Sequence, residues 1–503
     1  SECLVGSEMC IRDRNYNITD TTIAEPCASS MILTFRAIGY NLEAAVADII
    51  DNSISANAKN IWFNSEWQGG NSFITILDDG CGMNHEELVQ AMKPGAKNPM
   101  DERSEKDLGR FGLGLKTASF SQCKKLIVLS KKAGFAPIYW IWDLNYVNQT
   151  NKWELIRYPI PDIFLHALDE LKSGTLVIWT DLDRIIPTNT LNSNEIVKGK
   201  FLEQMEKVRQ HLSMTFHRFI EEKNIKLFCW GHEIKPWNPF LLTEKATQAF
   251  PEEHFNEAKM KGYVLPHKCH LTEEIYKTAE GINGWTNQQG FYVYRGKRLI
   301  LAGDWLGLFR KEEHYKLVRI QIDLPNKLDT DWQIDIKKST ARPPFTCREQ
   351  IKKYTLEVRN RGVEVFRHRG KILTIRKQQE FQSLWLEKKQ GKKYSFIINR
   401  DHLMIAEFKQ LAKIEPDKAI EYLLRFVEET IPTKSVFIRE SEQGVNTEPF
   451  EETNLEVVKL MIKQIYKTQI ATGKNVEQVK LILASMEPFN NFPELIEIVD
   501  SYE

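Results

Sequence analysis

Three polar segments decide how this chain folds: ADIIDNS (residues 47–53), FITILDDGCGM (residues 73–83) and LGRFGLGLKTAS (residues 108–119). The first lies in a run whose small and aliphatic residues recur at helical spacing. Asp48 and Asn52 are four residues apart on that predicted helix, so a carboxylate and an amide project from one face. Because both groups need polar partners, they fill a core poorly. The pair therefore indicates a site.

The second and third segments each end an apolar pattern with glycines. Residues 73–78 read as a β-branched strand that ends in an acidic residue and a glycine turn. In residues 108–119 glycines lead into a helix, whose N-terminus offers unpaired N–H groups and a positive dipole end to phosphate. Each segment taken alone is more often an ordinary turn. The order and spacing of all three favour a common site.

This order and spacing resemble the nucleotide site of the GHKL superfamily, which includes gyrase B, the ninety-kilodalton heat-shock chaperone, histidine kinases, MutL and the MORC ATPases. A fourth element of that family, a Gly-Thr pair on a later strand, has its counterpart in Gly174-Thr175. The pattern is most similar to MORC and MutL proteins, and a bacterial MORC-like protein is the expected type. The resemblance implies a Bergerat ATP-binding fold, an α/β (α+β) two-layer sandwich of one mostly antiparallel sheet with helices on one face.

Patterns along the chain extend this expectation to the other domains. We predict five segments: a leader or N-terminal arm (1–28), a GHKL ATP-binding domain (29–194), an S5-like α/β transducer domain (195–346), a basic helical linker (347–400) and a C-terminal helical domain (401–503). Strand patterns occur at 60–64, 73–78, 126–130, 138–144, 175–180, 226–230 and 290–295. Helix patterns occur at 29–38, 85–92, 201–224, 406–429, 455–472 and 476–485. Residues 1–14 lack the apolar core of a signal peptide, and we set them aside as a segment of suspected non-native origin.

The resemblance implies roles for individual residues of the ATP-binding domain. Asp48 would orient or deprotonate the attacking water, and Asn52 would ligate Mg²⁺. Asp78 would accept a hydrogen bond from the adenine amino group, with Gly82 behind the base and Thr175 nearby. The family has Glu where Asp48 stands, and the shorter side chain makes weak hydrolysis, or binding without turnover, a competing expectation.

The same motifs supply the other nucleotide-binding residues. These are Gly80, Met83, Gly109, Arg110, Phe111, Gly112, Leu113, Gly114, Leu115, Lys116 and Thr117. Residues 94–107 combine Pro, Gly, Asn and charged residues without periodicity, and their position matches the ATP lid of the family. A lid must be mobile when empty and ordered over phosphate when filled, so weak intrinsic structure is expected there.

The predicted second domain contains two basic features. GFYVYRGKRLI (residues 290–300) closely resembles a strand and turn of MORC ATPases, and its basic residues are either a ligand-binding patch or the soluble face of a hairpin. In the family, the second domain also sends a basic residue back to the γ-phosphate, whose charge a preorganised cation neutralises. The matching lead-in here favours Lys338 as that catalytic residue, with Lys337 one register away.

Composition limits the other classes of function. The 68 basic and 68 acidic residues balance, so no global field draws the chain to nucleic acid or membrane. No run of eighteen apolar residues occurs, which predicts no membrane span. Eight cysteines without a C-x-x-C speak against a zinc module and a disulfide framework. We expect a cytoplasmic protein.

A basic stretch at residues 348–377 is the best candidate for nucleic-acid contact. Within it, Arg367, Arg369 and Lys371 are the residues expected to bind DNA. The alternative is a solvated basic helix, which would have the same composition.

Two functions from different classes remain open. The favoured one is an ATPase that hydrolyses ATP slowly, closes and dimerises on ATP, and acts as a DNA-associated clamp in a MORC- or MutL-like restriction or phage-defence system. The alternative is a nucleotide-dependent interaction module or chaperone-like switch that binds ATP with little turnover. The expected ligands and partners are ATP with Mg²⁺, a second copy of the chain, DNA, and an effector protein of the same system.

Overall fold

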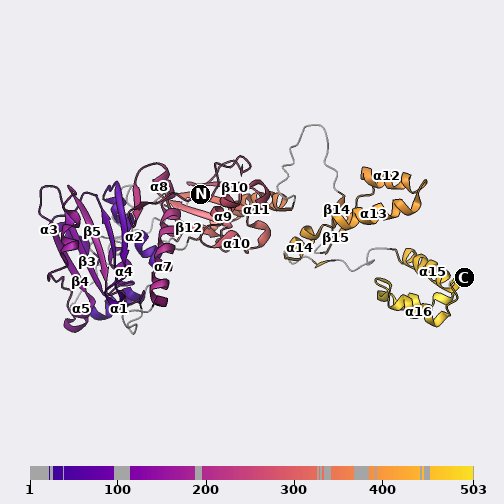
Figure 1. Ribbon diagram of the computed structural model, residues 1–503, viewed down its shortest axis with the longest axis horizontal. Coiled ribbons are helices and arrows are strands. Elements are labelled where there is room, and N and C mark those ends of the chain that lie inside the picture. Colours follow the sequence, from indigo (N-terminus) through magenta and orange to yellow (C-terminus); the bar gives the residue numbers. More distant parts are fainter. Residues whose placement is uncertain are drawn as a thin grey trace, which may run out of the picture. The chain divides into compact units, whose positions relative to one another are not determined.

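The computed structural model describes residues 22, 26–37, 39–95, 114–186, 195–325, 328, 331–333, 341–367, 384–390, 393–441, 445–446 and 454–501. The chain divides into two compact units, Ser1–Val363 and Glu364–Glu503 (Figure 1). The first unit carries two sheets, and helices pack against each of them. The second unit is mainly helical.

The first sheet is mostly antiparallel, with strand order β4-β3-β5-β2-β1-β6-β7. Its strands are β1 (Asn60–Glu66), β2 (Phe73–Asp78), β3 (Lys125–Lys131), β4 (Ile138–Asp143), β5 (Gly174–Thr180), β6 (Lys226–Cys229) and β7 (His232–Glu233). Among these strands, only β1 and β6 pair in parallel. The strands predicted from the sequence in this region are present with ends shifted by up to two residues.

Helices cover this sheet, as Figure 1 shows for α2, α4 and α7. The helices are α1 (Ala28–Ala37), α2 (Leu42–Ser55), α3 (His85–Met92), α4 (Gly114–Phe120), α5 (Leu144–Thr150), α6 (Asp162–Leu165), α7 (Glu195–Thr215) and α8 (His217–Glu221). The helix predicted at 201–224 is thus two helices. Asn41 starts α2 by accepting a hydrogen bond from the Ala44 N–H at 2.9 Å, which satisfies a donor of the first turn.

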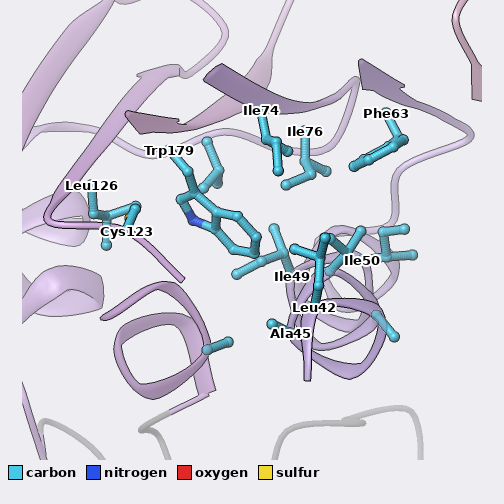
Figure 2. Close-up of a cluster of buried hydrophobic side chains, with 14 of the residues drawn as sticks. Leu42, Ala45, Ile49, Ile50, Phe63, Ile74, Ile76, Cys123, Leu126 and Trp179 are labelled. Carbon is cyan, nitrogen blue, oxygen red and sulfur yellow. The ribbon is translucent and has the colours of Figure 1, made fainter. Parts of the chain in front are cut away.

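The core between this sheet and its helices follows from side-chain alternation along the strands. Leu126 and Val128 of β3 face the large core under the helices, whereas Ile127 and Leu129 face a smaller apolar cluster on the opposite side. Figure 2 shows isoleucines of α2 directed toward Trp179 of β5 and the isoleucines of β2. The Trp179 indole is fully buried and donates to Ser119 Oγ at 2.8 Å, so its polar atom is satisfied.

The second sheet has strand order β12-β11-β13-β10-β8, with β9 paired to β10. Its strands are β8 (Gln248–Ala249), β9 (Glu253–Phe255), β10 (Ala258–Val264), β11 (Gly290–Arg295), β12 (Arg298–Asp304) and β13 (Val318–Leu324). The helices that follow or cover it are α9 (Glu273–Glu280), α10 (Gly284–Asn287) and α11 (Phe345–Arg367). A second α/β domain therefore follows the first, as predicted.

The pair α7 and α8 joins the two sheets. Phe201 and Met205 of α7 belong to the core of the first sheet. His217 of α8 lies 2.9 Å from the Tyr294 hydroxyl of the second sheet, and the Arg218 guanidinium lies 3.5 Å from the centre of the same ring. The boundary predicted between residues 194 and 195 therefore divides the first core. The polar residues before α7 suggested a linker, but α7, β6 and β7 complete the first layer.

The predicted basic helical linker at 347–400 needs correction. Helix α11 packs on the second sheet, where the Tyr354 hydroxyl accepts from the Gly262 N–H at 2.8 Å and donates to the Pro251 carbonyl at 2.7 Å. Contact is close enough that a Cβ on Gly262 would lie 2.5 Å from a Val358 methyl. Beyond α11 the chain forms an antiparallel hairpin. The lysines in both of its strands interrupt the alternation of apolar residues, so the sequence pattern did not predict it.

The second unit combines that hairpin with short helices. Its elements are β14 (Trp385–Gln390), β15 (Lys393–Ile398), α12 (Leu403–Leu411), α13 (Pro416–Thr430), α14 (Thr433–Ser441), β16 (Val445–Asn446), α15 (Leu455–Ala471), α16 (Val476–Ala484) and α17 (Pro493–Glu497). The prediction of a mainly helical C-terminal region is confirmed, but the region also holds β16, paired to β15. The single helix predicted at 406–429 is broken before Pro416, which starts α13 because proline is tolerated in a first turn.

Short 3₁₀ turns complete the described structure: η1 (Gly69–Asn71), η2 (His166–Leu168), η3 (Lys268–His270), η4 (Glu313–Tyr315), η6 (Phe489–Asn491) and η7 (Val499–Ser501). The described part of the chain contains no helix that is both long and apolar enough to span a bilayer. Its six described cysteines are free thiols.

Candidate nucleotide site

Helix α2 carries the first polar cluster of the site. Asp48 is buried, with 4% of its surface exposed, whereas Asn52 one turn later is exposed. The Tyr40 hydroxyl donates to Asp48 Oδ2 at 2.9 Å. The start of α4 lies on the same side, since a Cβ on Gly114 would be 3.8 Å from Asp48 Oδ2. The first and third sequence motifs therefore meet at Asp48.

Arg298, the first residue of β12, brings the second domain into this cluster. Its Nε lies 2.8 Å from one Asp51 oxygen and 2.9 Å from the other, and an Nη lies 3.3 Å from Asp48 Oδ1. The three side chains are at most 5% exposed, so the ion pairs are shielded from water. The sequence left two alternatives for Arg298, a ligand-binding patch or the soluble face of a hairpin, and neither predicts its burial against α2.

The end of β2 carries a second buried carboxylate, Asp78. It accepts hydrogen bonds from the Ser53 hydroxyl at 2.8 Å and from the Gly80 N–H at 2.9 Å. Burial raises the pKa of Asp78, while the hydrogen bonds from Ser53, Gly80 and Thr175 oppose that rise. A carboxylate kept in an apolar setting by donors of this kind is a strong acceptor for a further N–H group.

Thr175 on β5 is paired with Asp78 in the sheet register. The Thr175 hydroxyl lies 2.9 Å from Ser130 Oγ, and the Met83 N–H donates to the same Ser130 oxygen at 2.9 Å. Strands β2, β3 and β5 therefore hold Asp78, Thr175 and Met83 in one hydrogen-bonded group. This group joins the second sequence motif to the Gly-Thr pair.

Gly82 has a structural reason for being glycine. Its φ is +63°, and a Cβ there would lie 1.9 Å from the Lys131 carbonyl oxygen. Gly82 thus allows the turn after β2 to pack on the backbone of β3. The role behind an adenine base that we predicted for Gly82 stays a prediction.

Gly82→Ala is expected to lower the free energy of unfolding by roughly 2–4 kcal/mol, because the left-handed backbone and the backbone contact both oppose a methyl group. Gly134→Ala is the matched control. Gly134 has a φ of +84° but open space around its missing Cβ, so it isolates the backbone cost of about 1 kcal/mol. Urea unfolding followed by tryptophan fluorescence measures both variants, and equal losses would contradict the packing role of Gly82.

The third motif is described only from Gly114 onward, and residues 109–113 lie outside the described residues. Gly114, Leu115, Lys116 and Thr117 form the first turn of α4. The Lys116 ammonium is buried and donates to the Ala91 carbonyl of α3 at 2.9 Å. Lys116 therefore links α3 to α4, and the contact to nucleotide predicted for it stays a prediction.

Other predicted residues fall elsewhere. Lys337, Lys338, Arg369 and Lys371 lie outside the described residues, as does most of the predicted lid at 94–107. Arg367 is the last residue of α11.

The predicted basic patch of the 290–300 hairpin divides between buried and exposed residues. Arg295 and Arg298 are both buried, and exposed Lys297 pairs with Glu222. The hairpin therefore directs one arginine into the site, and its three basic residues do not share one solvent face.

Asn52 is the residue predicted to ligate Mg²⁺. In the described residues, no group of three or more His, Cys, Asp or Glu side chains could hold a metal ion. Exposed Asn52 beside buried Asp48 fits a Mg²⁺ ion that takes its other ligands from phosphates and water, which is how protein-bound Mg²⁺ is usually held.

Comparison with known proteins places this site in a family. Residues 40–175 match the family "Histidine kinase-, DNA gyrase B-, and HSP90-like ATPase". A segment of 91 residues is 30% identical to "ATPase morc-1" of Caenorhabditis elegans and covers 18% of this chain and 10% of that protein. A segment of 59 residues is 42% identical to "DNA mismatch repair protein MutL" of Clostridium beijerinckii and covers 12% of this chain and 9% of that protein. The matches thus span about a tenth of each curated relative.

Among solved structures, the chain is similar to the ATPase and transducer domains of DNA topoisomerase II from Balamuthia mandrillaris. The TM-score is 0.36 at 11% sequence identity, and the alignment covers 65% of this chain and 85% of that one.

The family match spans the segment that contains Asp48, Asn52, Asp78 and Thr175. Residues 40–175 therefore form an ATPase domain of the GHKL superfamily, and the resemblance predicted from the sequence is confirmed. Within that superfamily the chain is similar to the MORC and MutL proteins.

Proposed function

We propose that this chain binds ATP with Mg²⁺, hydrolyses it slowly, and uses the nucleotide to control contact between its first two domains. The observation that carries the proposal is the meeting of Asp48, from the ATPase domain, with Arg298, from the second domain, in one buried cluster. A nucleotide that alters the position of Asp48 would therefore also alter its contact with Arg298, and so would act on both domains.

The donor set supports a role for each end of the site. Asp78 would accept from the adenine amino group, an acceptor role that an ionised carboxylate without any N–H of its own serves well. Asn52 would give its amide oxygen to Mg²⁺, which neutralises phosphate charge when bound. Lys338, or Lys337 beside it, would bring a cation from the second domain to the γ-phosphate.

Asp48 would position the attacking water. Its oxygens already accept from Tyr40 and pair with Arg298, but each carboxylate oxygen has two lone pairs and can still accept from water. Because these contacts hold the Asp48 carboxylate in one position, it is suited to orienting a water molecule.

The engagement of both Asp48 oxygens also favours the second candidate, a nucleotide-dependent switch with little turnover. Asp48 is one methylene shorter than the Glu that the resemblance implies for this position. In that case ATP binding alone would set the arrangement of the domains. Turnover by the wild-type chain distinguishes the two functions, because only the first requires phosphate release above background.

Assembly and partners are the finer part of the proposal. ATP-dependent dimerisation through the first domain, binding of DNA by Arg367, Arg369 and Lys371, and an effector protein of a restriction or phage-defence system are all proposed from the resemblance to MORC and MutL proteins. A clamp of this kind would act in the cytoplasm. A DNA contact made by these cations would weaken as salt is added.

A non-hydrolysable ATP analogue with Mg²⁺ is expected to convert a monomer, or a loosely joined dimer, into a compact dimer. The reason is that docking of the second domain over bound phosphate orders the lid and presents new surface to a second copy. Small-angle scattering with multi-angle light scattering measures both size and mass. Asp78→Asn under the same conditions is the control and should show no change. Identical profiles with and without a saturating analogue would rule out the clamp.

A further inference from the structure

The β11–β12 hairpin is built to deliver Arg298 to helix α2. Gly296 and Lys297 form its two-residue turn, and both have positive φ, at 52° and 72°. Turns of this type match the twist of the strands that they connect, so the hairpin has a fixed register. Arg298 is paired with Arg295 in that register and follows the turn directly. Its backbone is therefore held by the second sheet while its side chain enters the ATPase domain.

The guanidinium contacts two carboxylates that lie three residues apart on α2. Asp51 takes the Nε contacts at 2.8 and 2.9 Å, and Asp48 takes the longer Nη contact at 3.3 Å. Arg298 is thus anchored on Asp51 and reaches Asp48 with another nitrogen. This arrangement uses the planar fork of arginine, which a lysine ammonium cannot reproduce.

Asp48 is consequently held from two directions. Tyr40 binds Oδ2 from the segment before α2, and Arg298 pairs with Oδ1 from the second domain. Through these two contacts Asp48, the residue predicted to orient water, depends on an arginine that lies roughly half the chain away in sequence.

The charge of Arg298 also acts on His211. Burial, and then that charge, lower the pKa of His211 to about 4, so its imidazole is neutral at pH 7.

We propose that Arg298 is a positioning residue for ATP hydrolysis, through which the second domain sets the orientation of Asp48. The inference rests on the proposed function, because it assigns Asp48 to the attacking water. Movement of β12 relative to α2 would change the orientation of the Asp48 carboxylate. It would have less effect on the contact between Asp78 and adenine. The second domain would then control turnover more than affinity.

A double-mutant cycle tests the inference. Arg298→Met is expected to lower kcat about 100-fold, within the range for loss of acid–base positioning, while the Kd for Mg·ATP changes less than about threefold. In an Asp48→Ala background, the same change should lower kcat by less than about twofold further. Lys297→Met removes the exposed neighbouring cation and should leave kcat and Kd unchanged.

Two results would overturn the inference while the proposed function survives. One is a kcat for Arg298→Met within twofold of wild type, and the other is a full additional loss in the Asp48→Ala background. If Arg298→Met fails to fold, Arg298→Lys decides, since it keeps the charge without the fork. Arg298→Lys should lower kcat at least about tenfold at unchanged Kd. If its kcat equals that of the wild-type chain, the inference is overturned. Absence of turnover in the wild-type chain would instead overturn both the inference and the proposed hydrolysis, and would favour the nucleotide-dependent switch.

Discussion

Asp78→Asn is expected to weaken ATP binding at least about 100-fold while leaving the fold intact. Asn keeps one acceptor oxygen, which the Gly80 N–H occupies, so its NH2 group would face the adenine amino group donor to donor in a buried site, which costs a large share of specific affinity. The fold should survive because the amide oxygen can still accept from the Gly80 N–H and the Ser53 hydroxyl can turn to donate or accept. Isothermal titration calorimetry with Mg·ATP measures the affinity.

The same variant has an expected signature in stability. Burial raises the folded-state pKa of Asp78 above its unfolded value. The stability contributed by the protonated form is fully present below the unfolded pKa and is lost as pH rises through the folded pKa. At pH values above that range the raised pKa of Asp78 disfavours the folded state, so Asp78→Asn should unfold there at the same or a higher temperature than wild type.

Asp79→Asn is the matched control for the adenine assignment. Asp79 is the next residue, but its carboxylate accepts from the backbone N–H groups of Lys59 and Asn60 at 2.7 and 2.8 Å. The control should keep its ATP affinity even if its melting temperature falls. Unchanged affinity in Asp78→Asn, or equal loss in both variants, would contradict the role of Asp78.

Asp48→Ala is expected to lower ATP turnover by about 10²- to 10⁴-fold with little change in Kd. A group that orients the attacking water acts mainly in the transition state, whereas ground-state binding is assigned to Asp78 and Asn52. Arg298 keeps Asp51 as its partner in this variant, so the cluster retains an ion pair. Phosphate release and calorimetry on the same preparation separate the two effects.

The outcome that would contradict this assignment is a parallel loss of turnover and affinity in Asp48→Ala. That result would place Asp48 in ground-state binding or in the fold itself. Retained turnover would move water activation to another residue.

The sequence identified the first sheet, helix α2 and the carboxylate at the end of β2, because these depend on local patterns. Alternating β-branched residues define β2, and helical spacing puts Asp48 and Asn52 on one face. The Gly-Thr pair at residues 174–175 was recognised from its order in the chain. Its partnership with Asp78 through strand pairing could be seen only in the structure.

Long-range features escaped sequence reasoning. Strand β6 is added in parallel to β1 after α7 returns the chain to the sheet, and no local signal separates such a strand from one of the next domain. Arg298 lies 250 residues after Asp48. An arginine beside a glycine turn is usually exposed, so its burial depends on two carboxylates that only the folded α2 helix provides.

The most direct test of the account is calorimetric titration of the full chain with a non-hydrolysable ATP analogue, with and without Mg²⁺. The account predicts saturable binding of one nucleotide per chain, with weaker binding when Mg²⁺ is chelated, since Asn52 and the phosphates then lose the ion that joins them. No saturable heat at millimolar analogue, with the chain folded by circular dichroism, would contradict the claim that this is an ATP-binding site.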